Sequence, residues 1–257
     1  MDDELVARKP LCERVEVLKV PIDILPAEDI ERIIFSLLER GQGEDIVLLS
    51  LSDLLRARRN GEFRNYVRDA ALVIPISKSL VSGMRFLTGK TPVRYMPFDF
   101  VVNLLTMLER REFSIYMLGG KPSVLALSEK NIRETFPKLR IIGRFPGIIK
   151  KQAEDTILKV IRKSSPALLL IGQGVHGRER WVAKNTHRLN SGLRLWCSDL
   201  YSVFAKRRKR PPKAVFQYGF EWVVFCLHNP FRVVRFFSFI RYTFLLLFYR
   251  IFRKKMP

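Results

Sequence analysis

The stretch LLLIGQGVHGRERW, residues 168–181, places side chains capable of chemistry directly after an apolar run. Two glycines at the turn would let the backbone bend tightly and approach a ligand closely. The start of the following helix would offer unpaired N–H groups to an anion. The stretch is neither a GxGxxG nor a Walker loop, so a ligand-binding loop and an ordinary strand-to-helix connection both fit it. The residues that raise the question are Gly172, Gly174, His176, Arg178, Glu179, Arg180 and Trp181.

A second glycine pair, Gly119-Gly120, also follows an apolar run. Short apolar segments alternate with amphipathic ones along the chain, which predicts an α/β fold with a parallel sheet flanked by helices. In such sheets ligands gather at the carboxyl ends of strands, where both glycine pairs would lie. The expected strands are 15–23, 45–51, 70–75, 113–118, 140–143, 167–171 and 193–197. One helix is expected to start at Pro26, and the others are expected at 53–60, 98–112, 122–136, 150–163 and 178–190.

The charge of the chain is strongly positive and unevenly placed. Its 257 residues carry a formal net charge of +21, and from Lys206 onward thirteen Lys and Arg residues face the single acid Glu221, an excess of 13 − 1 = 12. This charge predicts an anionic partner: nucleic acid, a phosphate-bearing substrate or an acidic membrane surface. Three scattered cysteines and an N-terminus without a basic-then-apolar pattern favour a reducing cytoplasm over export.

The C-terminal segment NPFRVVRFFSFIRYTFLLLFYRIFRKKMP predicts a helix lying on a membrane. Its longest apolar stretch, 242–249, is far shorter than the ~20 residues needed to span a bilayer. A basic helix packed on the core is the alternative. Nucleic-acid binding by KRRKRPPK is the least favoured interpretation, because no RNA-binding aromatic signature, zinc finger or clear helix-turn-helix accompanies it. The cations expected to contact the membrane are Arg232, Arg235, Arg250 and Arg253 on one side and Arg241 opposite.

Five motifs stand in an order that resembles the WecG/TagA/CpsF family of bacterial glycosyltransferases: FSIYMLGGKPSV, FPKLRIIGRFPGI, LLLIGQGVHGRERW, RKRPPKAVFQYGFEW and NPFRVVR. The resemblance implies a Rossmann-like core over 1–205 and a basic, membrane-associating helical appendage over 206–257. It implies transfer of an N-acetylhexosamine from a UDP-sugar to a polyprenyl-diphosphate-linked acceptor in cell-surface polysaccharide synthesis. The enzyme would be peripheral, on the cytoplasmic face of the membrane. No cofactor and no metal are implied, and no D-x-D motif is present.

The resemblance also implies a set of binding residues. The segment GxGxPxQExW of the family keeps Gly172, Gly174, Glu179 and Trp181 here, whereas His176 and Arg178 replace the usual proline and glutamine. Two arginines would oppose a diphosphate in place of a metal. The expected substrate-binding residues are Arg94, Gly119, Gly120, Gly172, Gly174, Glu179, Trp181 and Arg210.

The sequence departs from the family where the general base is expected. An Asp-Gly pair usually follows a strand like 70–75, and Ile76-Ser77 stand there instead. A positioned carboxylate contributes about 10²–10⁴-fold to such a step, and isoleucine accepts no proton. LLS (48–50) and SDLYS (198–202) replace two further family segments. An active transferase would then use another base, Asp99 or Glu179, with Asp199 also in range. A lapsed paralogue that binds ligand without turnover is the alternative, and homo-oligomerisation stays open.

Overall fold

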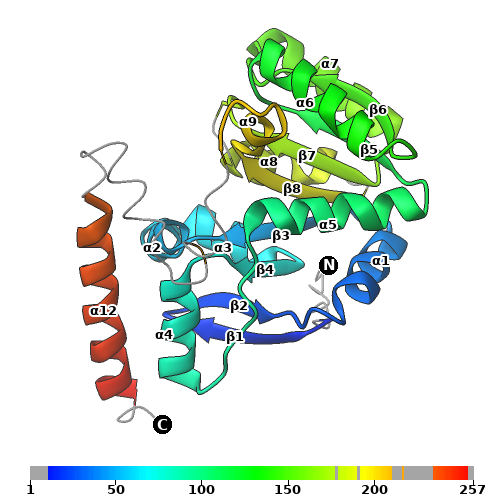
Figure 1. Ribbon diagram of the computed structural model, residues 1–257. Coiled ribbons are helices and arrows are strands. Elements are labelled where there is room, and N and C mark those ends of the chain that lie inside the picture. The colour runs from blue at the N-terminus through cyan, green and yellow to red at the C-terminus, as the bar shows by residue number, and fades with distance from the viewer. Residues whose placement is uncertain (1–10, 177–178, 190–191, 210–215, 217–233, 254–257) are drawn as a thin grey trace, which may run out of the picture.

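The computed structural model describes residues 11–176, 179–189, 192–209, 216 and 234–253, and within these it leaves out the side chains of residues 179, 234–236 and 253 (Figure 1). Its centre is a six-stranded sheet in the order β4-β3-β8-β7-β5-β6, with every neighbouring pair parallel. The expected α/β class with a parallel, Rossmann-like sheet is therefore confirmed. The strands are β3 (Glu44–Leu49), β4 (Leu72–Pro75), β5 (Ser114–Leu118), β6 (Arg140–Phe145), β7 (Leu168–Gly172) and β8 (Leu193–Ser198).

Helices cover both faces of this sheet, and alternate strand residues feed two separate apolar cores. One core includes α1 (Ile30–Arg40), α5 (Pro97–Arg110), α6 (Pro122–Thr135) and α9 (Leu200–Phe204). Figure 1 shows α5 crossing in front of the sheet. The other core includes α2 (Leu51–Arg59), α3 (Gly61–Asp69), α4 (Lys78–Thr88), α7 (Lys151–Ser164) and α8 (Glu179–Asn185), with the 3₁₀ turn η1 (Thr186–Arg188) following α8.

The segment predicted as one strand over 15–23 is a hairpin of β1 (Glu13–Val17) and β2 (Val20–Ile24). Its turn residues Leu18 and Lys19 both have positive φ, 53° and 67°. The prediction missed the turn because neither residue type favours that conformation. Asp23, 1% exposed, accepts a 2.6 Å hydrogen bond from the Val73 backbone N–H and so ties the hairpin to edge strand β4.

Three α-helices were not predicted, namely α3, α4 and the short α9. Asn60 was expected to end a helix, and it does end α2, but its side chain also accepts a 2.9 Å bond from the Phe63 N–H and starts α3. Phe63, Tyr66 and Val67 then bury one side of α3, which is the helical spacing that should have indicated it. Helix α4 follows β4 directly and ends at Gly89 in the left-handed conformation.

The C-terminal helix α12 (Val234–Arg253) lies outside the layered core, along α2 and α4 (Figure 1). It packs through Tyr242, 1% exposed, and Leu246, 8% exposed. The ring of Tyr242 rests on α4 at Gly83, where a β-carbon would lie 2.0 Å from the tyrosine hydroxyl. Among the described residues no helix combines the length and the apolar character needed to cross a membrane.

Candidate active site at the carboxyl edge of the sheet

The strand order creates a topological switch point between β5 and β7. The chain leaves β5 for β6 on one side and leaves β7 for β8 on the other, so the two connections diverge. In open parallel sheets ligands bind in the crevice where such connections separate. The turn after β5 carries Gly119 and Gly120, and the turn after β7 carries Gly174. The residues picked out by sequence therefore flank the place that the topology marks for a ligand.

The glycine turns touch each other through their backbones. A β-carbon on Gly119 would lie 2.6 Å from the carbonyl oxygen of Gly172, and the N–H of Gly120 donates to the carbonyl oxygen of Gln173 at 2.5 Å. Gly119 and Gly174 have φ of 112° and 94°, a region that side chains other than glycine rarely adopt. Turn geometry and close packing thus account for these glycines, and the N–H of Gly120 already has an acceptor.

A third glycine-containing turn, with Gly147 after β6, contacts these two turns, and Gly147 was not selected from the sequence. Its N–H donates to the carbonyl oxygen of Gly120 at 3.0 Å, and a β-carbon on it would lie 2.7 Å from the Gln173 carbonyl oxygen. The motif FPKLRIIGRFPGI contains it, so the signal was present as a glycine after a strand. The backbone oxygen of Ser198 accepts a 2.7 Å hydrogen bond from the Gln173 N–H, and Ser198 itself has a φ of 52°. We call these contacting turns at the ends of β5, β6, β7 and β8 the glycine rim.

Tyr201 fills the inner side of this rim. Its ring would lie 2.4 Å from a β-carbon on Gly172 and 3.3 Å from one on Gly120. The ring is 1% exposed and its hydroxyl donates to the carbonyl oxygen of Leu170 at 2.6 Å. Burial raises the pKa of this hydroxyl well above its usual value. A neutral, buried tyrosine is therefore a wall of the crevice, and a ligand would approach from the solvent side of the glycines.

The other half of the edge is formed by the ends of β3 and β4. Ser50 caps α2 in a reciprocal capping box with Asp53, whose carboxylate accepts from the Ser50 hydroxyl at 2.5 Å. The Ser77 hydroxyl accepts a 3.1 Å bond from the Leu51 N–H, which holds the starts of α2 and α4 together. The sequence analysis named Ser50 and Ser77 only as departures from the family and did not predict the cap, although Ser-x-x-Asp is a capping signal.

Arg94 belongs to this half of the edge. Its Nε donates to the carbonyl oxygen of Ile76 at 3.0 Å, which places it beside the residue that stands where an aspartate was expected. Its Nη1 donates to the carbonyl oxygen of Phe216, and its guanidinium carbon lies 3.7 Å from the centre of the Phe216 ring. Arg94 therefore connects the β4 loop to the C-terminal part of the chain.

The structure does not bring Arg94 beside the glycine turns. Strand β4 lies three positions from β7 in the sheet order, roughly 14 Å at the usual strand spacing. One extended ligand lying along the edge could reach both places. Arg210, the second arginine expected there, lies outside the described residues.

Glu179 and Asp199 follow β7 and β8 at this edge, and Asp99 lies at the start of α5, the helix that leads back into β5. Asp99 is half-buried in the first turn of α5. Glu179 is the first residue of α8, and its side chain is outside the described part. Asp199 follows β8 and forms an ion pair with Arg208. The expected bases therefore share the edge with Arg94 and the glycines.

Trp181 and His176 have different surroundings. The indole of Trp181 is 7% exposed in the core, and its N–H donates to the Glu154 carboxylate on α7 at 2.6 Å. Its contacts fix α8 against α7, so its influence on a ligand at the glycine turn would be through the position of α8. His176 is exposed after the turn.

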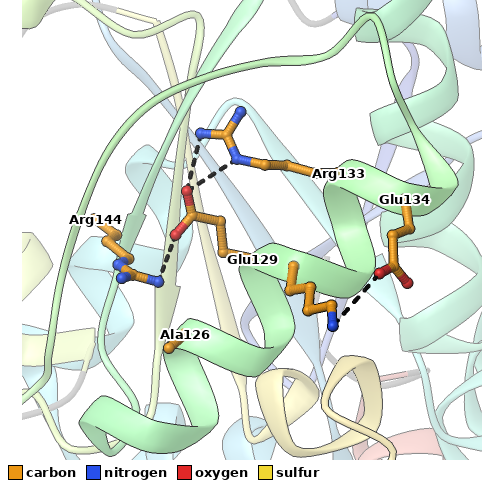
Figure 2. Close-up of a pocket in the computed structure, with 6 residues that line it drawn as sticks. Ala126, Glu129, Arg133, Glu134 and Arg144 are labelled. Atoms are coloured by element: carbon orange, nitrogen blue, oxygen red, sulfur yellow. Dashed lines mark hydrogen bonds and ion pairs between the residues drawn. The ribbon is translucent and has the colours of Figure 1, made fainter.

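A surface hollow lies away from this edge, beside the outermost strand β6 (Figure 2). Figure 2 shows Glu129 on α6 between Arg133 and Arg144, with an ion pair to each. Lys130 and Glu134 form a further, exposed pair at 4.0 Å. The charges in the hollow are thus largely matched among themselves, which leaves the carboxyl edge as the candidate site.

A sequence profile of the Glycosyl transferase WecG/TagA/CpsF family matches residues 15–256. The chain belongs to this family. The match includes the glycine turns, Arg94 and the whole of α12, and it confirms the resemblance drawn from the five motifs. The chain is therefore assigned to a class of glycosyl transferases.

Two proteins similar to this chain carry the same name, N-acetylglucosaminyldiphosphoundecaprenol N-acetyl-beta-D-mannosaminyltransferase. The one from Bacillus spizizenii is 22% identical over 206 residues, which cover 80% of this chain and 79% of the relative. The one from Bacillus subtilis strain 168 is 20% identical over 187 residues, covering 73% and 72%. Both names describe transfer of an N-acetyl-beta-D-mannosaminyl group to N-acetylglucosaminyldiphosphoundecaprenol.

Proposed function

We propose that this family member transfers an N-acetylhexosamine from a UDP-sugar to a polyprenyl-diphosphate-linked acceptor in cell-surface polysaccharide synthesis. The observation that carries the proposal is the family match over 15–256, which includes a glycine-lined rim at the topological switch point. The names of both relatives support a lipid-linked acceptor and an N-acetylmannosamine product linkage.

The donor diphosphate would lie along the carboxyl edge, between the glycine rim and Arg94. Helix α6 starts directly after Gly120, with Pro122 in its first turn and no side chain capping its N–H groups. A helix start of this kind attracts phosphate. Arg94 and Arg210 would meet the charge that grows on the leaving UDP, in the way that paired donors stabilise a transition state.

The proton of the acceptor hydroxyl would be taken by a carboxylate on the same edge. Asp99 and Glu179 are the proposed bases, since both begin helices that start there. The lipid-linked acceptor would be met at the cytoplasmic membrane face, with the protein bound peripherally.

Membrane contact would be made by the appendage. Of the five arginines proposed for it, Arg232 lies outside the described residues, and the side chains of Arg235 and Arg253 are not described. Arg250 contacts Phe86 on α4 through the backbone oxygen and the ring. Arg241 is exposed. The solvent side of α12 is mainly apolar, which supports contact with lipid through both phenylalanines and cations.

UDP release from UDP-N-acetylhexosamines in the presence of a lipid-diphosphate acceptor analogue tests the transferase proposal. Arg94→Ala should weaken UDP binding about 10–100-fold, because a hydrogen bond to a charged group contributes about 1.5–3 kcal/mol. The UDP affinity of Arg94→Lys should lie between those of the unaltered protein and of Arg94→Ala. Arg110→Ala, at the far end of α5, is the matched control and should leave UDP affinity unchanged.

A thermal unfolding midpoint for each variant separates lost binding from lost folding, since Arg94 also holds the Ile76 carbonyl. Unchanged UDP affinity in a folded Arg94→Ala protein would contradict the proposed anion site. The second candidate function is ligand binding without turnover, favoured by Ile76 in place of the expected aspartate. Tight UDP binding with no UDP release above background would select it.

A further inference from the structure

Helix α8 is too short to fix its own position. It has seven residues, Glu179–Asn185, and isolated helices of this length are marginal in water. Its place therefore depends on the contacts that it makes with neighbouring helices. That place bears on the proposed reaction, because Glu179, one of the two proposed bases, is the first residue of α8 and follows the turn after β7.

Two of the side-chain contacts that anchor this segment are exposed ion pairs. Arg180 pairs with Glu62 on α3 at 2.9 Å, and the two side chains are 62% and 41% exposed. Arg188 in η1 pairs with Asp155 on α7 at 2.6 Å, and the Asp155 side chain is 72% exposed. Because water and salt screen exposed charges, such pairs contribute little. They are weak anchors for α8.

The third contact is shielded from water and has a charged acceptor. The indole N–H of Trp181 donates to Oε1 of Glu154 on α7 at 2.6 Å, and the side-chain amide of Asn185 donates to the same oxygen at 3.4 Å. Trp181 and Asn185 are each 7% exposed. Hydrogen bonds to a carboxylate are stronger than bonds between neutral groups, and a low local dielectric strengthens them further. Glu154 is therefore the strongest polar anchor of α8 among the described residues.

The glycine rim has a support of its own. Backbone hydrogen bonds join its turns directly: the N–H of Gly120 donates to Gln173, the N–H of Gly147 to Gly120, and the N–H of Gln173 to Ser198. These three bonds connect the ends of strands and include neither α7 nor α8. A shift of α8 would therefore move Glu179 and leave the rim, where the donor diphosphate is proposed to lie, in place.

We propose that Glu154 is a positioning residue for the transfer reaction, which holds α8 through Trp181 and Asn185 so that Glu179 meets the acceptor hydroxyl. The inference rests on the proposed function and adds to it a residue that acts from another helix. A general base must lie within hydrogen-bond reach of the proton that it takes, and a misplacement of about 1 Å can cost about 10²-fold in rate. Loss of Glu154 should therefore slow the transfer and spare the binding of UDP.

UDP release and UDP binding, measured separately on the full-length protein, test this role. Glu154→Leu removes the acceptor and should lower kcat about 10–100-fold. Its UDP affinity should change less than about threefold, since kcat and ground-state binding report different interactions. Glu154→Gln should keep most of kcat, because its amide oxygen still accepts from the indole N–H. Trp181→Phe keeps an aromatic ring but loses the donor, and it should reproduce the loss of kcat.

The matched control is Asp155→Ala, which removes the neighbouring carboxylate of α7 and only an exposed ion pair. It should change kcat less than about threefold. In a Glu179→Gln protein, Glu154→Leu should lower kcat no further, because the group that it positions is gone. An equal loss with and without Glu179 would overturn the proposal. So would a Glu154→Gln protein as slow as Glu154→Leu.

Amide hydrogen exchange in α8 gives a readout that needs no turnover. Glu154→Leu should speed the exchange of the α8 amides about tenfold or more, whereas Asp155→Ala should leave it unchanged. Unchanged exchange in Glu154→Leu would overturn the anchoring role. If the unaltered protein releases no UDP, the transferase proposal fails, and the exchange data still decide whether Glu154 holds α8. A thermal unfolding midpoint for each variant separates a displaced helix from a lost fold.

Discussion

Arg194 and Asp45 show how a single pair of residues fixes the centre of the sheet. They are direct neighbours across β8 and β3, and two hydrogen bonds of 2.8 Å join the guanidinium to the carboxylate. Arg194 is 2% exposed and also donates to the Gly43 carbonyl oxygen at 2.9 Å. Burial opposes the charge, but the bonds and charge of Asp45 outweigh it and raise the pKa of Arg194. The pair specifies the register of two strands far apart in sequence.

Arg194→Met should lower the free energy of unfolding by about 3–5 kcal/mol, because it leaves a buried carboxylate without its partner. Arg194→Met/Asp45→Leu should recover much of that loss. Urea unfolding at neutral pH measures both. Lys130→Ala removes an exposed pair at 4.0 Å and should change stability by no more than about 0.5 kcal/mol. Equal stability of the single and double variants would contradict this account.

At the scale of elements, α12 is attached to the core by a small contact. Tyr242 fits against Gly83 on α4, and Leu246 is buried beside it. Among the described residues the buried Tyr242 hydroxyl has no hydrogen-bond partner, and burial raises its pKa. Shape rather than polar bonding therefore holds this part of α12, and the glycine is required because the ring takes the space of a side chain.

Gly83→Ala should detach α12, because its β-carbon would lie 2.0 Å from the Tyr242 hydroxyl. We expect faster proteolytic cleavage within α12 and little change in unfolding of the core. Gly61→Ala is the control, since a β-carbon there meets nothing within 4 Å.

Tyr242→Phe should be neutral or slightly stabilising, because it removes an unsatisfied buried hydroxyl. A Gly83→Ala protein as resistant to protease as Gly61→Ala would show that α12 adapts to the added methyl group.

At the scale of the whole molecule, α12 lies along one side of the core (Figure 1), and it exposes a row of large apolar side chains, namely Phe237, Phe244, Phe248 and Ile251. The chain as a whole carries +21, yet binding to a membrane needs the apolar row as well as attraction. The helix also exposes Arg241 and Arg250, and Phe216, which precedes it in the chain, accepts a hydrogen bond from Arg94. If α12 binds a lipid surface, we expect the carboxyl edge to lie near that surface.

Phe244→Ser/Phe248→Ser should lower vesicle partitioning about tenfold or more, since each exposed ring would lose burial in lipid. Sedimentation with phosphatidylglycerol vesicles measures the loss. Ile148→Ser/Val160→Ser changes residues 73% and 49% exposed elsewhere on the surface and should have little effect. A chain ending at Asn229 that still sediments fully with vesicles would contradict a role for α12.

The sequence by itself determined the α/β class and most strand positions, because apolar residues recur with different periods in strands and in helices. Five motifs in order determined the family. The sequence also located both glycine turns. It missed the β1–β2 hairpin and α3, since the turn at Leu18-Lys19 uses residue types that do not favour positive φ, and the Asn60-Gly61 break both ends and starts a helix. The local preferences of Leu18 and Lys19 are overridden because the hairpin packs against β4.

Only the tertiary structure decided which residues meet. The strand order placed the glycine turns at the switch point and Arg94 three strands away, which no spacing in the sequence shows. The tertiary structure also buried Trp181 beside Glu154 and packed Tyr242 of α12 against Gly83 of α4. The physical reason is that side-chain periodicity reports which face of an element is buried, whereas partners are chosen by the crossovers that order the sheet.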